Sequence, residues 1–389
     1  MKEKIAFVVQ RYGLEVNGGA ELHCRQLAEK LSQYYDIEIL TTCALDYMNW
    51  KNYYDEGVED INGITVRRFK VDKERNIKTF NKLSEQVLNN PNGDYDNNIQ
   101  WMNEQGPVCH GLIKYLDENE EKYKKVIFMT YLYWTTFFAM QKHNSKSILI
   151  PTAHDEPPIY LNIFKEFFKK PKYIAFNTVD EQNFVHELFK NDDIPSDIFG
   201  VGVDIPENLP EIDIHKKFNF DGEYLLYIGR IDESKGCKEL FDYFTRYIKE
   251  TGSDLKLVLM GKQVMNIPKH KNIISLGFVS DEEKFNGIKQ AKLVVVPSKF
   301  ESLSMVVLES LKLNKPVVVN GKCSVLRTHC ILSNAGLYYE NYYEFKEAVE
   351  FMNKHNDVYK IMKDNGSKYV CSSYDWQLII DKFRDIIKW

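Results

Sequence analysis

The sequence predicts an α/β protein with two doubly wound domains, each a parallel sheet covered by helices on both faces. Short apolar runs alternate with helical patterns along the whole chain, and strands separated by helices form parallel βαβ units. The alternation occurs twice, and a stretch richer in proline and charge, near residues 203–222, separates the two halves. A length of 389 residues also suits two domains, because a domain typically takes roughly 100–200 residues.

The first half starts with an apolar run at residues 5–9, which predicts a buried strand. Apolar residues then recur at helical spacing from Ala20 to Leu31 and predict the helix that follows. Five further runs predict strands at residues 37–40, 65–69, 126–129, 147–150 and 173–176. These elements place the first domain at residues 1–203.

The second half repeats the pattern and predicts a domain at residues 204–375. A strand is expected at 224–228 and a helix at 237–250. Later runs predict strands at residues 255–260, 273–276, 293–296 and 316–319. Residues 376–389 form an amphipathic pattern and predict a last helix. We expect two Rossmann-like domains that face each other across a cleft, with the chemistry in the loops after the strands.

Charge and apolar patterning restrict the class of protein. A net charge of -5 and a pI of about 6.1 argue against general nucleic-acid binding, which needs a positive field. No apolar run reaches the roughly 20 residues of a membrane-spanning helix, and the run at residues 5–9 is too short for a signal peptide. We therefore expect a cytoplasmic protein. Peripheral association with the inner face of a membrane, through a local basic patch, stays open.

The cysteines predict neither a disulfide framework nor a metal site. There are seven, an odd number, and no two have C-x-x-C spacing. We expect reduced and mostly buried thiols, as in a cytosolic protein.

A glycine-containing loop follows the first predicted strand. Asn17, Gly18 and Gly19 precede the helix that starts near Ala20. Glycines at such a turn let the backbone approach a phosphate, and the helix N-terminus adds N–H donors; a plain flexible turn is the alternative. The chain has no G-x-G-x-x-G at this place, which argues against a nicotinamide dinucleotide.

Two cations follow the strand at residues 224–228. Arg230 and Lys235 are five residues apart and lie between Gly229 and Gly236. A planar guanidinium and a compact ammonium suit the two phosphates of a diphosphate. The alternative is a pair of solvated surface charges, but their place directly after a buried strand favours binding.

Two glutamates, Glu301 and Glu309, follow the strand at residues 293–296. We expect Glu301 to lie in the loop at the start of a helix and Glu309 about two turns into that helix. The N–H groups of residues 302–305 would then be free for a phosphate or sugar oxygen. The alternatives are dipole complementation for Glu301 and a solvent-facing position for Glu309. The rest of this helix is apolar, so a carboxylate inside it needs a partner.

These motifs together resemble family 4 of the glycosyltransferases, the "group 1" retaining enzymes of the GT-B fold. The pairing of G-R-x-x-x-x-K-G with E-x7-E is the most specific feature. The resemblance extends along most of the chain, through NGGAELHCRQLAEKL, Val201-Gly202-Val203-Asp204, the glycines Gly261 and Gly277, and YDWQLIIDKF. The resemblance implies that the last helix crosses back to the first domain.

The resemblance also implies roles for individual residues. Arg230 and Lys235 would hold the donor diphosphate, Glu301 the donor sugar and Glu309 the ribose. The remaining nucleotide-sugar contacts would come from Gly229, Gly261 and the backbone N–H groups of Leu303, Ser304 and Met305. Gly18 and Gly19 would approach the diphosphate or the acceptor from the other domain. No metal and no cofactor are expected beyond the donor, a UDP or GDP sugar, because cations and a helix terminus replace the metal.

The segment Pro151–Pro158 supplies a further candidate. His154 follows a predicted strand and lies beside Asp155 and Glu156. The resemblance implies that His154 contacts the donor sugar or the acceptor, whereas the plainer interpretation is a structural histidine bonded to its neighbours.

Ser304 departs from the family pattern, which has glycine at this position, so the backbone contact there is less closely implied.

The expected activity is transfer of a hexosyl-type sugar, with retention, to a glycan, a lipid-linked acceptor or a protein, in polysaccharide or glycoprotein biosynthesis. Assembly with partner glycosyltransferases stays open. Three alternatives remain on the same scaffold: an epimerase, a phosphorylase, and a non-catalytic subunit that binds nucleotide sugars. Epimerases need differently arranged acids, and phosphorylases of this fold often need a pyridoxal lysine; no clear sign of either is present.

Overall fold

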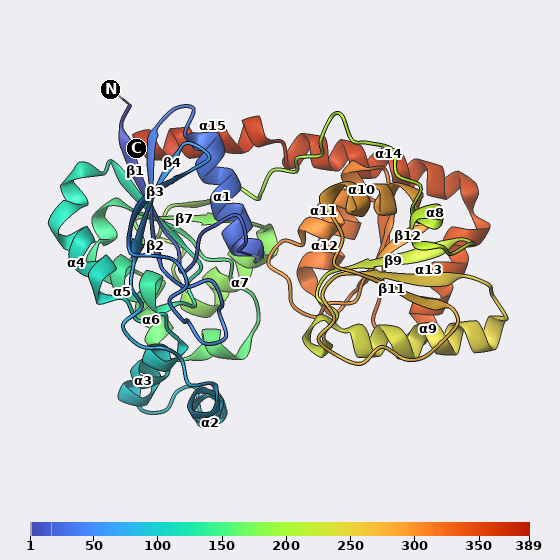
Figure 1. Ribbon diagram of the computed structural model, residues 1–389, viewed down its shortest axis with the longest axis horizontal. Coiled ribbons are helices and arrows are strands. Elements are labelled where there is room, and N and C mark those ends of the chain that lie inside the picture. The colour runs from blue at the N-terminus through green and yellow to red at the C-terminus, as the bar shows by residue number, and fades with distance from the viewer. Residues whose placement is uncertain (1, 17) are drawn as a thin grey trace. The chain divides into compact units, whose positions relative to one another are not determined.

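The computed structural model describes residues 2–16 and 18–389, so the predicted role of Asn17 lies outside the described residues. The chain divides into two compact units. The first comprises residues 1–201 with 379–389, and the second comprises residues 202–378. The observed boundaries are therefore 201/202 and 378/379, close to the predicted 203/204 and 375/376. Each unit is a doubly wound α/β layer structure, which confirms the predicted fold class (Figure 1).

An eight-stranded sheet forms the centre of the first unit, in the order β3-β4-β2-β1-β5-β6-β7-β8. All neighbours are parallel except β3 and β4. The elements are β1 (Lys4–Val8), α1 (Gly19–Leu31), β2 (Asp36–Thr42), β3 (Gly57–Ile61), β4 (Ile64–Phe69), α2 (Ile77–Leu88), α3 (Tyr95–Gln105), α4 (His110–Asn119), β5 (Lys125–Met129), α5 (Trp134–Lys142), β6 (Ser147–Ile150), α6 (Ile163–Phe167), β7 (Tyr173–Phe176), α7 (Val179–Phe189) and β8 (Ser196–Ile198). Helices α4 and α5 lie on one side of the sheet and α1 on the other (Figure 1).

A six-stranded, all-parallel sheet forms the centre of the second unit, in the order β11-β10-β9-β12-β13-β14. Its elements are α8 (Ile214–Phe218), β9 (Tyr224–Ile228), α9 (Cys237–Thr251), β10 (Lys256–Met260), β11 (Ile273–Gly277), α10 (Asp281–Gln290), β12 (Leu293–Val296), α11 (Met305–Lys312), β13 (Val317–Asn320), α12 (Ser324–Ser333), β14 (Gly336–Tyr339), α13 (Tyr342–Lys354) and α14 (Asn356–Ser373). The most central strands, β9 and β12, are followed by the two candidate loops of this unit.

The last helix, α15 (Trp376–Lys388), begins in the second unit and belongs to the first from Ile379 onward. Its apolar stripe accounts for this, because Ile379, Phe383 and Ile387 are fully buried. The ring of Phe383 lies 4.5 Å from that of Phe199, between centroids. Lys382 donates to the Ile198 carbonyl at 2.6 Å. A helix with such a stripe needs an apolar partner, and the end of the first sheet provides it.

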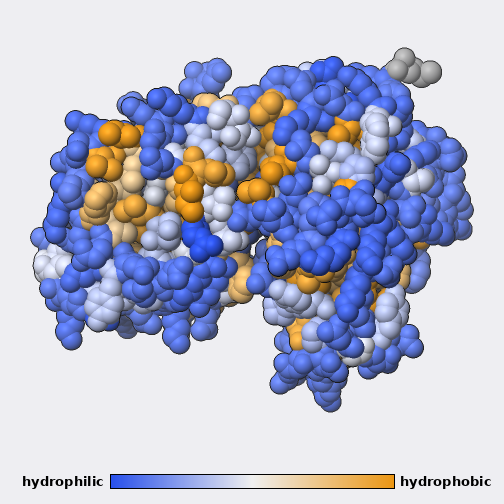
Figure 2. Space-filling model, turned by 180° about the vertical axis from the view of Figure 1, so that it is seen from behind, coloured by the Kyte–Doolittle hydropathy of each residue, from blue (hydrophilic) through white to orange (hydrophobic). Residues whose placement is uncertain are grey.

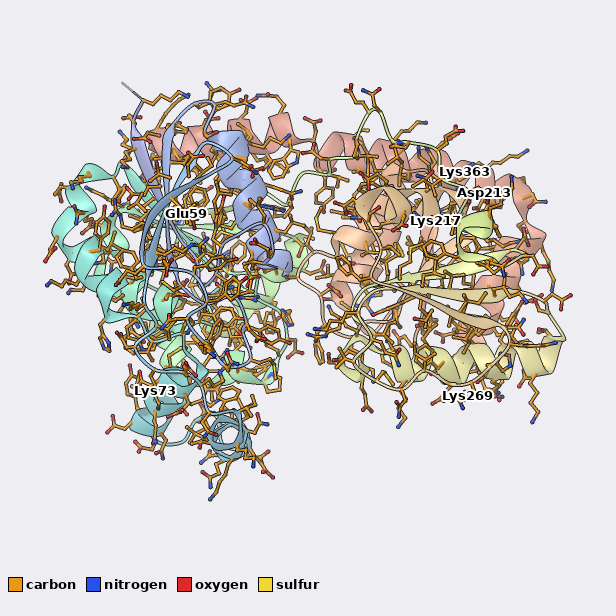
Figure 3. All side chains as sticks on the ribbon, in the orientation of Figure 1. Glu59, Lys73, Asp213, Lys217, Lys269 and Lys363 are labelled. Carbon is orange, nitrogen blue, oxygen red and sulfur yellow. The ribbon has the colours of Figure 1, made fainter. Side chains whose placement is uncertain are left out.

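Three strands, β3, β8 and β14, have no counterpart among the predicted elements. The sequence of β3, GVEDI, is almost wholly exposed and has no apolar run. Pairing with β4 holds this strand, and Glu59, which is labelled in Figure 3, forms an ion pair with Arg68. The predicted linker likewise contains a short helix, α8, whose Lys217 forms an ion pair with Glu283 of α10 at 2.6 Å. Tertiary contacts stabilise these segments where local patterning is weak.

The surface seen from behind is mainly hydrophilic, with apolar side chains gathered in a few patches (Figure 2). Within the described residues, the helices include none that is both long and apolar enough to cross a membrane. All seven cysteines are free thiols, and all but Cys371 are buried, as expected for most of them.

Candidate functional site

The loop after β9 presents Arg230 at the carboxyl end of the second sheet. Its guanidinium lies 3.3 Å from the Asp232 carboxylate and 3.4 Å from the Ser234 hydroxyl, and the side chain is 40% exposed. Asp232 is fixed in turn, because it accepts from the Ser234 backbone N–H at 2.8 Å. Bonds from Ser234 and the charge of Arg230 hold the pKa of Asp232 below its usual value. Arg230 is thus oriented by an ionised neighbour and remains accessible to a ligand.

Lys235 and Glu301, predicted on separate motifs, meet in space. The Lys235 ammonium lies 2.8 Å from Oε1 of Glu301. Backbone packing explains the approach. A Cβ on Gly236, which has a φ of 77°, would lie 2.2 Å from the Pro297 carbonyl oxygen. The loops after β9 and β12 can therefore come this close only with glycine at residue 236.

Gly229 and Gly261 form a second close backbone contact at the same sheet edge. The Gly229 N–H donates to the Met260 carbonyl at 2.9 Å. A Cβ on Gly261 would lie 1.9 Å from the Gly229 carbonyl oxygen, and both residues have positive φ angles. Both glycines have a structural role in joining the loops after β9 and β10. Whether they also contact a nucleotide stays a prediction.

The segment from Glu301 to Ser304 is a loop, and this corrects the expected start of the helix. Helix α11 begins at Met305, so Leu303 and Ser304 precede it and Glu309 is one turn in, not two. Ser304 has a φ of 67° and a ψ of 79°, a left-handed conformation that favours glycine. Ser304 therefore occupies a position with a specific backbone demand, directly before the first turn of α11.

A buried histidine that the sequence analysis missed supports this loop. His329 of α12 donates from Nε2 to the Leu303 carbonyl at 2.7 Å. Its Nδ1 lies 3.0 Å from the Tyr369 hydroxyl on α14. The segment around His329 contains no motif, so no local signal could have identified it.

Glu309 is buried, as the apolar helix around it predicted, but its partner comes from the protein. The Lys284 ammonium of α10 lies 3.0 Å from Oε1 of Glu309. Burial raises the pKa of Glu309 above its usual value, and the charge and hydrogen bond of Lys284 oppose that rise. The solvent-facing interpretation of Glu309 is therefore wrong. Lys284 is a second residue that the motifs did not reveal.

In the first unit, the glycine loop packs against a buried ion pair. Arg11, which follows β1, lies 2.5 Å from Glu21 in the first turn of α1. A Cβ on Gly18 would lie 2.0 Å from the Glu21 carboxylate, whereas a Cβ on Gly19 would meet nothing within 4 Å. A side chain at residue 18 would therefore displace the Glu21 carboxylate, whereas Gly19 leaves open space beside the start of α1. This open space fits the predicted approach of a ligand at Gly19.

The loop after β6 holds His154 beside Glu156, with Nε2 3.5 Å from the carboxylate. Glu156 also accepts from the Tyr131 hydroxyl at 2.7 Å, and Asp155 accepts from the Tyr160 hydroxyl at 2.6 Å. Buried Glu181 of α7 fixes the loop backbone by accepting from the Ala153 N–H at 2.5 Å. The structural interpretation of His154 thus has a partner, and its side chain still keeps 28% exposure.

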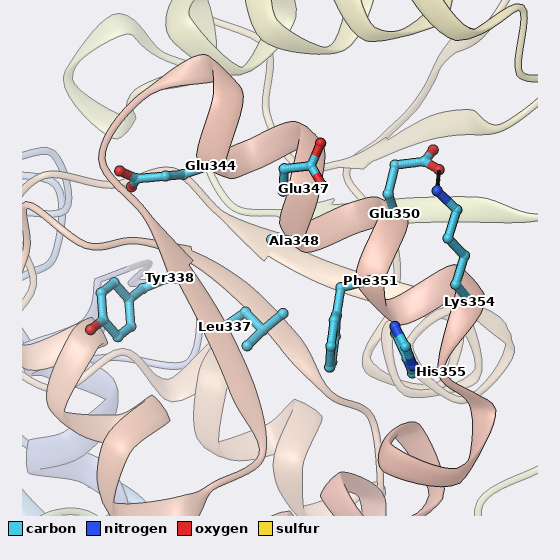
Figure 4. A pocket seen from close by; sticks show the side chains of 9 residues that line it. All are labelled: Leu337, Tyr338, Glu344, Glu347, Ala348, Glu350, Phe351, Lys354 and His355. Atoms are coloured by element: carbon cyan, nitrogen blue, oxygen red, sulfur yellow. Dashed lines mark ion pairs between the residues drawn. The ribbon is translucent and has the colours of Figure 1, made fainter.

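A surface hollow of about 390 Å³ lies elsewhere, between β14 and α13 (Figure 4). Leu337, Ala348 and Phe351 line it together with acidic residues of α13, and Glu350 is paired with Lys354 there. It shares no residue with the candidate site, so we assign it no part in the chemistry. The described residues also include no group of three or more His, Cys, Asp or Glu side chains placed to hold a metal ion.

Comparison with known proteins bears on the second unit directly. Residues 210–369 match the family described as glycosyl transferases group 1. This group 1 segment contains Arg230, Lys235, Glu301 and Glu309, whereas Gly18, Gly19 and His154 lie outside it.

Other known proteins are similar to this chain over nearly its whole length. The uncharacterized glycosyltransferase MJ1607 of Methanocaldococcus jannaschii is 20% identical, over 99% of this chain and 98% of its own length. Sucrose-phosphate synthase from Thermosynechococcus elongatus has a TM-score of 0.71 at 15% identity, covering 100% of this chain and 98% of that chain. Anabaena HepE, solved in complex with UDP and glucose, has a TM-score of 0.69 at 13% identity, with 99% of each chain covered. At these identities the structural likeness shows a shared fold, GT-B, for the chain as a whole.

Proposed function

We propose that this protein is a retaining glycosyltransferase that moves a sugar from a nucleoside diphosphate sugar to a glycan, lipid-linked or protein acceptor without a metal ion. The observation that carries the proposal is the Lys235–Glu301 ion pair at 2.8 Å, next to Arg230, inside the group 1 segment. A cation for a phosphate and a carboxylate for sugar hydroxyls are thereby adjacent, as the junction between a diphosphate and its sugar requires.

The charges at this junction suit departure of a nucleoside diphosphate. The bond between the anomeric carbon and the terminal phosphate oxygen breaks, and negative charge grows on that oxygen. Arg230 and Lys235 stabilise the growing charge, together with the first amides of α11. These cations take the place that a divalent metal has in other transferases, which supports the metal-independent proposal.

Carboxylates provide the rest of the donor site. Glu301 accepts from hydroxyls of the transferred sugar, and Glu309 accepts from the ribose. Because HepE was solved with UDP, UDP sugars are the first donors to test, with GDP sugars beside them. The second unit thus binds the donor, and the first unit, through the loops of Gly19 and His154, binds the acceptor. The acceptor hydroxyl oxygen bonds to the anomeric carbon on the face from which the diphosphate leaves, which retains the anomeric configuration, and the hydroxyl proton passes to the departing phosphate oxygen.

Thermal shift and turnover test the proposal. A nucleoside diphosphate at a hundredfold excess over its dissociation constant should stabilise the protein by about 2.7 kcal/mol, and EDTA should leave the shift intact. Abolition of the shift by EDTA would refute the metal-independent part.

Arg230→Ala should lower donor turnover, measured as release of nucleotide, by roughly 10²-fold or more. Lys238→Ala is the matched control, since Lys238 lies nearby but is 67% exposed, and the carboxylate nearest to it is 4.0 Å away. Wild-type turnover in Arg230→Ala would show that this loop does not bind the diphosphate.

A further inference from the structure

An ion pair joins helices α10 and α11. Its carboxylate, Glu309, belongs to the E-x7-E motif, but its cation, Lys284, belongs to none of the motifs described above. The Lys284 ammonium lies 3.0 Å from Oε1 of Glu309 and 3.1 Å from Oδ1 of Asp281. Both members of the main pair are largely buried, with side-chain exposures of 19% for Lys284 and 11% for Glu309. Within the described residues, the second carboxylate oxygen of Glu309, Oε2, has no hydrogen-bond partner.

We propose that Lys284 is a positioning residue of the donor site, which holds Glu309 as a carboxylate through Oε1 and leaves Oε2 to accept from a ribose hydroxyl. The proposal rests on the proposed function, because it assigns the ribose to Glu309. It adds a residue outside the E-x7-E motif and a pH dependence that the motif alone does not predict.

The position of Lys284 is well fixed. It lies in the first turn of α10, which begins with a reciprocal capping box between Ser280 and Glu283. Glu283 is held from the other side by Lys217 of α8 at 2.6 Å. The ammonium also lies 4.3 Å from the centroid of the Phe285 ring. These contacts limit the freedom of the helix turn that carries Lys284, so the ammonium can define where the Glu309 carboxylate points.

Electrostatics gives Lys284 a second effect. Burial raises the pKa of Glu309, the negative charge of Asp281 raises it further, and Lys284 is the cation that opposes both. The pKa of Lys284 is raised: burial lowers it, but Glu309 and Asp281 outweigh that effect. Without Lys284, the buried carboxyl would take up a proton at a higher pH. A protonated carboxyl has lost part of its acceptor capacity, and it binds ribose hydroxyls less well.

The consequence is a specific pH profile for nucleotide binding. In the wild type, the charge and hydrogen bond of Lys284 oppose the rise in the pKa of Glu309 that burial causes, so the carboxylate persists to a lower pH than it would without Lys284. In Lys284→Met, the acceptor is lost as pH falls through the raised pKa of Glu309. We therefore expect UDP affinity, relative to wild type at the same pH, to fall by a further tenfold or more between pH 8 and pH 6. The UDP phosphate titrates in the same way in both experiments, so its effect cancels in the ratio of the two affinities.

Isothermal titration of the full-length protein with UDP at both pH values tests this, with Lys289→Met as the control on an exposed position of the same helix. Lys284→Arg keeps the charge and should restore most of the affinity and the pH profile of the wild type. Titration with 2′,3′-dideoxy-UDP should remove the difference between Lys284→Met and the wild type, since this nucleotide has no ribose hydroxyl. Circular dichroism establishes that each variant is folded.

Each outcome decides a separate point. If the wild type binds neither UDP nor GDP, the proposed function fails. If the wild type binds UDP and folded Lys284→Met shows the same pH profile, the proposed function survives and the role of Lys284 is refuted. An equal loss of affinity for UDP and for the dideoxy nucleotide would also overturn it, because Lys284 would then act on some other part of the ligand.

Discussion

Removal of the Lys235–Glu301 ion pair should lower turnover strongly but change the free energy of unfolding only slightly. The Lys235 ammonium and the Glu301 carboxylate make one contact, with an N–O distance of 2.8 Å. The side chains are 36% exposed for Lys235 and 18% exposed for Glu301. Such partly solvated pairs contribute about 0.2–1 kcal/mol to the free energy of unfolding. For a unit of this size, that corresponds to a melting temperature lower by roughly 0.4–4 °C. Lys235→Met should therefore remain folded and lose little stability.

The effect on turnover should be much larger. If Lys235 stabilises charge on the leaving diphosphate, its removal should cost about 2.7–4 kcal/mol in the transition state, or roughly 10²–10³ in kcat. Glu301→Gln keeps the shape of the side chain but weakens acceptance from sugar hydroxyls, and it should reduce kcat/KM for the donor.

The assay measures nucleotide release from the sugar donor and thermal unfolding without ligand, for both single variants, the double variant and Lys238→Met. In the double variant, the two losses in kcat/KM should fail to add, because the groups act on one junction of the donor. Wild-type turnover in folded Lys235→Met would show that Lys235 does not act on the leaving diphosphate. A melting temperature lowered by far more than about 4 °C would show that the pair is mainly structural.

Three further predictions concern single residues. Ser304→Gly should raise the melting temperature by roughly 1–3 °C, since glycine relieves about 0.5–1 kcal/mol of backbone strain at the left-handed φ. Ser304→Ala should leave the melting temperature unchanged, because the Ser304 hydroxyl makes no capping hydrogen bond to α11. Gly261→Ala should lower the free energy of unfolding by more than about 1 kcal/mol, measured by urea denaturation, because the added Cβ would lie 1.9 Å from the Gly229 carbonyl. Burial lowers the pKa of His23 to about 4, so its neutral form is favoured on folding. The wild type should then lose stability relative to His23→Gln as pH falls from 6.5 to 4, by about 3 kcal/mol across the window; parallel stability curves for the two proteins would contradict this.

The central strands and the helices between them could be predicted because their patterns are local. The runs at β9, β12 and β13 are uninterrupted and fully apolar or nearly so, as strands buried on both faces must be. Edge elements lack this signal. Strand β3 forms because β4 offers hydrogen bonds, and the sequence GVEDI contains no pattern that predicts a strand. The start of α11 was misplaced for a related reason, since the left-handed turn at Ser304 that delays the helix is not encoded by a residue with an evident preference for it.

In the candidate site, the order of residues along the chain specifies which residue types follow which strands. Arg230 and Lys235 follow β9, and Glu301 and Glu309 follow β12. Parallel strands bring their carboxyl ends to one edge, so rough proximity follows from topology alone. The pairing of individual side chains, in contrast, depends on contacts that form only in the folded chain. Contacts between residues far apart in the sequence join Lys235 to Glu301, Lys284 to Glu309 and His329 to the Leu303 carbonyl. Such contacts depend on how helices pack across the sheet, and no periodicity or spacing within one segment contains that information.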